Sequence, residues 1–196
     1  MTSLQKLFAK IDNINNQGRG EVFDKNEEPR MTFDRPDWFE NVRTEVMAAH
    51  ERAAIFDCSS FGKIEVRGPE AEAFLLHTCS GFLSRAPGSV IYTAVLNERG
   101  TFESDITAQR IAHDHYRLFV GTAAIKRDLA WFQKHSEGFS VSMIDSTEDY
   151  AVLGLMGPEV ARIVSECGAP ELNQLAYFKV GTAHIAGKHV RAARMS

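Results

Sequence analysis

Apolar and polar residues alternate most regularly in the middle of the chain. Residues 90–96, 102–111 and 116–120 place apolar side chains at about every second position, as strands with one buried face do. Polar turn residues at 97–100 and 113–115 separate these segments. The pattern therefore predicts a three-stranded antiparallel meander.

Apolar residues at helical spacing predict four helices. They cover about 37–52, a segment starting after Gly68-Pro69-Glu70, about 123–135, and 158–167. The side chains expected to face inward are Phe39, Val42 and Val46 in the first, Ala71, Phe74 and Leu75 in the second, and Ile125, Leu129 and Phe132 in the third. Shorter runs predict strands at 55–57, 63–67, 139–144 and 150–156, and a hairpin around Gly187.

One local pattern occurs twice, at 64–70 and at 153–159. In each, an apolar strand ends at Gly, Pro occupies the first turn of a helix, and Glu lies at the positive end of the helix dipole. The repeat predicts an α+β fold of two related halves, with mainly antiparallel sheets and packed helices. Independent origin of a common junction explains the repeat equally well.

Composition and charge narrow the class of protein. The 196 residues are 44% hydrophobic and 24% charged, which is typical of a folded soluble protein. The net charge of -4, without a dense basic stripe, argues against nucleic acid or anionic membranes as partners. No apolar run approaches the length of a membrane span. We expect a cytoplasmic protein, or one of the mitochondrial matrix if the source is eukaryotic.

Two regions are expected: a polar, Asn- and Gly-rich leader over 1–35, loosely ordered, and one domain over 36–196. The cysteines, Cys58, Cys79 and Cys167, are too far apart to suggest a zinc site or a disulfide framework. We expect reduced core thiols and no metal.

The meander carries the candidate chemistry. Asp105 shares one face of its strand with Glu103 and Thr107, while Phe102, Ser104 and Ile106 point the other way. A carboxylate at the centre of a sheet can stabilise a cationic amine substrate in a cleft, or it can belong to a solvated strand face. Glycine motifs for dinucleotides or phosphate loops are missing from the sequence.

Several motifs together resemble the folate-binding half of dimethylglycine and sarcosine dehydrogenases, which is similar to the glycine cleavage T-protein in the aminomethyltransferase family. The resemblance runs over 35–196. Its motifs are RPDWF at 35–39, FDCSSFGK at 56–63, GPEA at 68–71, YTAVLNERG at 92–100 and ESDIT at 103–107.

The resemblance implies that a methylated or protein-bound amine, as an iminium, delivers a one-carbon unit to tetrahydrofolate, giving 5,10-methylenetetrahydrofolate. It implies that Asp105 is catalytic and holds the folate amine, that Tyr92 contacts the pterin, and that Thr107 and Tyr177 line the folate site. Because 1–35 hold no dinucleotide fingerprint, no FAD is expected.

The chain also departs from the family. It has Gly100-Thr101 where the family usually has Gly-Gly, and it ends before the Tyr-x-Gly-Glu segment and the C-terminal barrel. We therefore expect a C-terminally incomplete module, which a second chain could complete. The alternative is a non-catalytic folate-binding or interaction module without independent activity.

Overall fold

The structure, a computed structural model, describes residues 32–36 and 38–196. Most of the expected leader, and Asp37 at the expected start of the first helix, lie outside the described residues. Two compact units are present. The first unit holds the described residues up to Phe56 with Gly154–Gln174 and Ala183–Val190, and the second unit holds Asp57–Leu153, Leu175–Thr182 and Arg191–Ser196.

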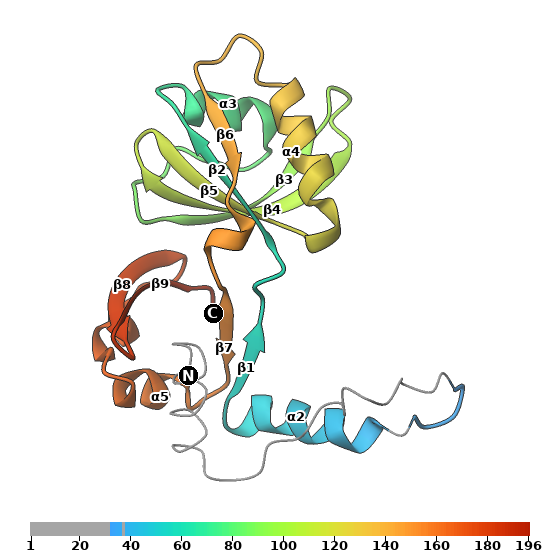
Figure 1. Ribbon diagram of the computed structural model, residues 1–196, viewed down its shortest axis with the longest axis vertical. Coiled ribbons are helices and arrows are strands. Elements are labelled where there is room, and N and C mark those ends of the chain that lie inside the picture. The colour runs from blue at the N-terminus through green and yellow to red at the C-terminus, as the bar shows by residue number, and fades with distance from the viewer. Residues whose placement is uncertain (1–31, 37) are drawn as a thin grey trace. The chain divides into compact units, whose positions relative to one another are not determined.

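The second unit is built on a five-stranded antiparallel sheet with the order β3-β4-β5-β2-β6 (Figure 1). Its strands are β2 (Gly62–Arg67), β3 (Val90–Leu96), β4 (Phe102–Ala112), β5 (His115–Val120) and β6 (Ser142–Asp145). The expected meander is confirmed as β3, β4 and β5, which are neighbours in that order. The strand β2 extends the sheet by pairing with β5 on one side and β6 on the other.

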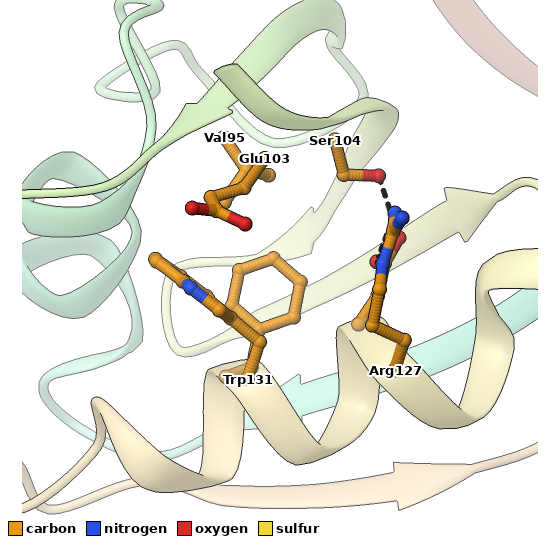
Figure 2. Close-up of a pocket in the computed structure, with 7 residues that line it drawn as sticks. Val95, Glu103, Ser104, Arg127 and Trp131 are labelled. Carbon is orange, nitrogen blue, oxygen red and sulfur yellow. Dashed lines mark hydrogen bonds and ion pairs between the residues drawn. The ribbon is translucent and has the colours of Figure 1, made fainter. Parts of the chain in front are cut away.

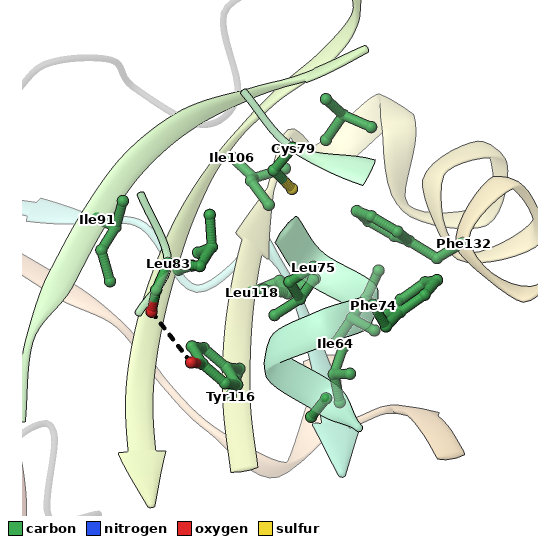
Figure 3. Packing of buried hydrophobic residues seen from close by; sticks show 14 of the residues in the cluster. Ile64, Phe74, Leu75, Cys79, Leu83, Ile91, Ile106, Tyr116, Leu118 and Phe132 are labelled. Atoms are coloured by element: carbon green, nitrogen blue, oxygen red, sulfur yellow. Dashed lines mark hydrogen bonds between the residues drawn. The ribbon is translucent and has the colours of Figure 1, made fainter. Parts of the chain in front are cut away.

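Helices α3 (Ala71–Thr78) and α4 (Ile125–Lys134) pack on one face of this sheet, here called the core face. Figure 3 shows Leu75 of α3 against Leu118 of the sheet, and Phe74 of α3 on the side of Phe132 of α4. The ring of Phe74 meets that of Phe132 edge-on, with 6.1 Å between the centroids. The inward positions expected for α3 are confirmed, since all three are fully buried.

The first unit contains α2 (Phe39–Glu51), β1 (Ala54–Asp57), β7 (Leu153–Met156) and α5 (Val160–Glu166), and β1 pairs with β7. Its small core forms around Ile163, Cys167 and Leu155. The first expected helix is confirmed as α2, although no side chain on it is buried within the described structure.

The expected hairpin at Gly187 is confirmed as β8 (Lys179–Ile185) and β9 (Lys188–Arg194), which contribute residues to both units. Its turn places Ala186 and Gly187 at positive φ, 51° and 75°, as two-residue hairpin turns of the primed type require. Short 3-10 helices lie at η1 (Thr122–Ala124), η2 (Thr147–Asp149) and η3 (Pro170–Gln174).

The repeated strand–Gly–Pro–helix junction is present in both units. Gly68 and Gly157 have φ values of 143° and 116°, a region that disfavours side chains. A Cβ on Gly157 would also lie 2.6 Å from the Arg52 carbonyl oxygen. The strands that precede the two junctions have different neighbours, because β2 lies inside a sheet and β7 pairs with β1 alone. The α+β class with antiparallel sheets is confirmed.

Candidate functional site

A tight turn sets the start of β4 and therefore the positions of its side chains. The Gly100 amide donates to the Asn97 carbonyl oxygen at 2.8 Å, and the Asn97 side chain accepts the amides of Arg99 and Thr101 at 3.0 and 3.1 Å. Gly100 has φ 72°, which favours glycine. Asn97 and Gly100, which belong to the motif at 92–100, thus determine the backbone conformation of this turn.

Tyr92 and Asp105 meet on the face of the sheet opposite α3 and α4. This face, here called the polar face, carries Tyr92 on β3, Asp105, Thr107 and Gln109 on β4, Arg117 and Phe119 on β5, and Lys63 and Glu65 on β2. The Tyr92 hydroxyl donates to Asp105 Oδ2 at 2.8 Å. This hydrogen bond, with the negative charge of Asp105, raises the pKa of Tyr92. Both side chains are exposed, Tyr92 to 62%.

Thr107 and Tyr177 complete the set of expected site residues. Thr107 pairs with Tyr92 across β3 and β4 and with Phe119 across β4 and β5, so it lies between two aromatic residues on the polar face. Tyr177 is 58% exposed and precedes Phe178, whose carbonyl oxygen accepts the Val90 amide at 2.9 Å. The structure thus brings Tyr92, Asp105 and Thr107 together and attaches Tyr177 beside the start of β3.

The sequence did not indicate a buried ionic group on the same polar face. The Glu65 carboxylate accepts a hydrogen bond from Arg117 Nε at 2.5 Å and also contacts His115 Nε2. The Glu65 side chain is only 6% exposed. Ser146 Oγ donates to the same carboxylate at 3.2 Å. The guanidinium of Arg117 also stacks on Tyr150, with its carbon 3.8 Å from the ring centroid. These contacts hold β2, β5 and the segment after β6 together.

Lys63 is fully buried beside this group. Its ammonium donates to the carbonyl oxygens of Ser59 at 2.7 Å and Thr147 at 3.0 Å. Burial lowers the pKa of Lys63, while nearby carboxylates, first that of Glu148, partly offset the effect. The sequence held one sign of this group. In the segment 63–67, charged and apolar residues alternate, which places Lys63, Glu65 and Arg67 on the strand face opposite Ile64 and Val66.

Two hollows lie elsewhere in the second unit. One, of about 10 Å³, lies between β4 and α4, and Figure 2 shows Glu103, Ser104 and Trp131 around it. The other, of about 210 Å³, is lined by Gly88, Arg110, Ile111, Val180, Gly181, Thr182 and Arg191. Neither is lined by Tyr92 or Asp105, which lie on the exposed part of the polar face.

The described residues contain no group of three His, Cys, Asp or Glu side chains arranged to hold a metal ion. None of the described helices is both long and apolar enough to cross a membrane. Of the three cysteines, Cys79 and Cys167 are buried and Cys58 is half-buried. The exposed part of the polar face carries a carboxylate and a phenol that are hydrogen-bonded to each other.

Comparison with known proteins shows where the chain belongs. A family model described as the GCVT N-terminal domain matches residues 2–196. Curated aminomethyltransferases match as well, among them that of Thermosipho melanesiensis, 27% identical over 74% of this chain and 40% of its own length. That of Rubrobacter xylanophilus is 31% identical over 83% of this chain and 44% of its own length. The chain thus spans less than half the length of these relatives.

Solved structures share the fold. The glycine cleavage system aminomethyltransferase T of Bartonella henselae superposes with a TM-score of 0.62 at 27% identity, over 70% of this chain and 37% of that one. A heterotetrameric sarcosine oxidase from Corynebacterium superposes with a TM-score of 0.52 at 13% identity, over 81% of this chain and 80% of that one, which indicates the fold alone. Since the family match covers nearly every residue, the chain belongs to the GCVT N-terminal domain family.

Proposed function

We propose that this chain is a tetrahydrofolate-binding module of one-carbon transfer. A methylated or protein-bound amine, as an iminium, delivers its one-carbon unit to tetrahydrofolate on this chain, and 5,10-methylenetetrahydrofolate forms. Membership of the GCVT N-terminal domain family supports the proposal, as does the similarity to curated aminomethyltransferases. The rest of the machinery belongs to protein outside this chain, as a second chain or a further domain.

The single observation that carries the proposal is the hydrogen bond between Tyr92 and Asp105 on the polar face. As a folate nitrogen attacks the iminium carbon, its lone pair forms the new C–N bond and the C=N electron pair moves to the donor nitrogen. Positive charge then develops on the folate nitrogen. The Asp105 carboxylate stabilises that charge and accepts the proton released, in a role that grows toward the transition state. The donor nitrogen then takes up this proton and leaves as an amine when its bond to the carbon breaks. The second folate nitrogen bonds to the same carbon and loses its own proton, which gives 5,10-methylenetetrahydrofolate.

The neighbouring residues have binding roles in this proposal. The exposed ring of Tyr92 packs against the pterin, and its hydroxyl keeps the Asp105 carboxylate oriented. Thr107 offers a hydroxyl between Tyr92 and Phe119, and Tyr177 adds a second exposed aromatic ring beside the start of β3. These groups suit a flat heterocycle with polar edges.

The test compares Asp105→Asn with Asp114→Asn, a matched control that removes the same charge from an exposed turn. Tetrahydrofolate affinity is measured by fluorescence quenching. Transfer is measured as the initial rate of 5,10-methylenetetrahydrofolate formation, above the uncatalysed rate, with an iminium donor generated enzymatically from sarcosine. We expect Asp105→Asn to lower the transfer rate about 100-fold and the affinity much less, because the amide keeps the shape but loses the charge.

Two results would count against the proposal. A chain that does not bind tetrahydrofolate excludes the folate module altogether. Binding without any transfer in the presence of donor and partner chain instead identifies a non-catalytic folate-binding module. In either case Asp105→Asn and Asp114→Asn would show the same rate of 5,10-methylenetetrahydrofolate formation.

A further inference from the structure

The strand that carries Asp105 is irregular just before that residue. In the pairing of β3 with β4, Val95 lies opposite Ser104 and Leu96 lies opposite Phe102, so Glu103 has no partner of its own. Such a bulge bends the strand and changes where the following side chains point, and bulges are frequent beside active sites. The direction of the Asp105 side chain therefore depends on how the segment Glu103–Ser104 is held.

A buried hydrogen bond holds this segment from the core face. Ser104 Oγ donates to Asp128 Oδ2 on α4 at 2.6 Å. The Ser104 residue is 6% exposed and Asp128 is 3% exposed. The other oxygen of Asp128 accepts from Arg127 Nε and Nη2 at 2.9 and 2.8 Å. A helix carboxylate is thus connected to the residue immediately before Asp105.

Stability alone does not account for this pair. Taking a carboxylate out of water carries a desolvation cost that its partners offset only in part, and an apolar pair of similar size is often at least as stable. Val95, Trp131 and Phe132 line the same small cavity, so apolar contacts are available there, next to Glu103 and Arg127. What the hydrogen bond adds over apolar contact is a fixed distance and direction between α4 and β4.

A second hydrogen bond holds the bulge at the end nearer the turn. Asn97, in the turn before β4, donates through Nδ2 to Glu103 Oε1 at 2.7 Å. Glu103 is thereby connected to the turn and Ser104 to the helix, and Asp105 is the next residue along the strand. Its carboxylate then reaches the Tyr92 hydroxyl.

We propose that Ser104 and Asp128 are positioning residues, which fix β4 from the core face so that the Asp105 carboxylate faces Tyr92 and the folate nitrogen. The part that concerns folate rests on the proposed function, whereas the part that concerns Tyr92 does not. Ser104 and Asp128 touch no reacting atom in this proposal. They act through the direction of Asp105.

The test uses the pKa of Tyr92, which Asp105 raises and which a merely structural role of Ser104 would not change. The chain is labelled with ¹³C at tyrosine Cζ, its NMR spectrum is recorded over alkaline pH, and Tyr92→Phe identifies the signal. We expect Ser104→Ala to lower the Tyr92 pKa by most of the amount that Asp105→Asn lowers it. Asp128→Asn keeps an oxygen acceptor for Ser104, so we expect the Tyr92 pKa of this variant to stay near that of the wild type.

Thr78→Val is the matched control. It also removes a buried hydroxyl, but one that donates to the Phe74 carbonyl oxygen within α3 and not to a residue of α4. We expect no change in the Tyr92 pKa there, with circular dichroism confirming the fold at each pH. Asp128→Ala removes the acceptor from the helix side and is used if Ser104→Ala does not fold. An unchanged Tyr92 pKa in the folded variant overturns the inference.

Tetrahydrofolate affinity and transfer rate, measured on the same variants, separate the two proposals. If both hold, Ser104→Ala lowers the transfer rate at least 10-fold and the affinity less than 3-fold, in the same direction as Asp105→Asn. If the Tyr92 pKa falls but neither Ser104→Ala nor Asp105→Asn alters the transfer rate, the positioning role stands and the proposed function is wrong.

Discussion

Replacing Glu65 with glutamine tests the ionic group buried on the polar face. The Glu65 side chain is 6% exposed and that of its partner Arg117 is 11% exposed. Removing one partner of a buried ion pair costs about 3–5 kcal/mol, because the remaining charge is buried without compensation. The amide oxygen of glutamine still accepts a hydrogen bond, so we expect the free energy of unfolding to fall by about 3 kcal/mol.

The same carboxyl group makes the stability depend on pH. Burial by itself raises the pKa of Glu65, but the hydrogen bonds and charges of His115 and Arg117 together outweigh burial and hold that pKa below its ordinary value of 4.5. A group whose pKa is lowered by folding stabilises the protein fully above its unfolded pKa. That contribution is lost as pH falls through the folded pKa. The effect of Glu65→Gln therefore shrinks as the pH falls below about 4.5.

Urea unfolding followed by Trp131 fluorescence measures this effect in the second unit. A Trp38→Phe background is needed, because the chain has 2 tryptophans. Glu98→Gln is the control, because it removes an exposed carboxylate of the same unit and such surface changes have little effect on stability. Equal unfolding midpoints for Glu65→Gln and the parent would refute the reasoning, and so would a difference that persists unchanged at pH 3.

Three further outcomes follow from the packing. Phe74→Ala is expected to lower the free energy of unfolding by about 3–5 kcal/mol in urea titration, because its ring is fully buried. Gly157→Ala is expected to lower the thermal midpoint more than Gly168→Ala, since both have positive φ but only at Gly157 would the new Cβ meet backbone atoms within 3 Å. Burial raises the pKa of Cys79 to about 11, so a disulfide reagent at pH 8 is expected to modify half-buried Cys58 first.

The sequence predicted the meander well because strand alternation there is a local property. The strands β3, β4 and β5 follow the apolar pattern, and short turns leave little choice of partner. The insertion of β2 between β5 and β6 was not predictable in this way. Partners far apart in the sequence are chosen by packing of the whole core, which the pattern of one strand does not contain.

The candidate site was predictable in part for the same reason. Alternation places Asp105 and Thr107 on one face of β4, as the sequence predicts, and the register with β3 then brings Tyr92 to them. The bulge at Glu103 was not predicted, and Phe102 before it is 63% exposed, unlike buried Ser104 after it. The roles of these residues in folate chemistry remain a prediction.

The burial of Glu65 escaped prediction for another reason. A charged residue on a strand usually faces water, and nothing local indicates that Arg117 on β5 and Tyr150 after β6 will enclose it. Such an enclosure depends on contacts between segments more than 30 residues apart in the sequence. Burial of paired charges is therefore visible only once the tertiary structure is known.

Mapping tetrahydrofolate onto the chain by amide NMR tests the central claim most directly. The chain is labelled with ¹⁵N and titrated with tetrahydrofolate under reducing conditions, and the shifted amides are assigned. The account predicts that the largest shifts cluster on the polar face around Tyr92, Asp105 and Thr107, and that Asp105→Asn leaves the same residues affected. Shifts concentrated instead around Gly88 and Arg191 at the larger hollow, or no shifts at saturating ligand, would contradict it.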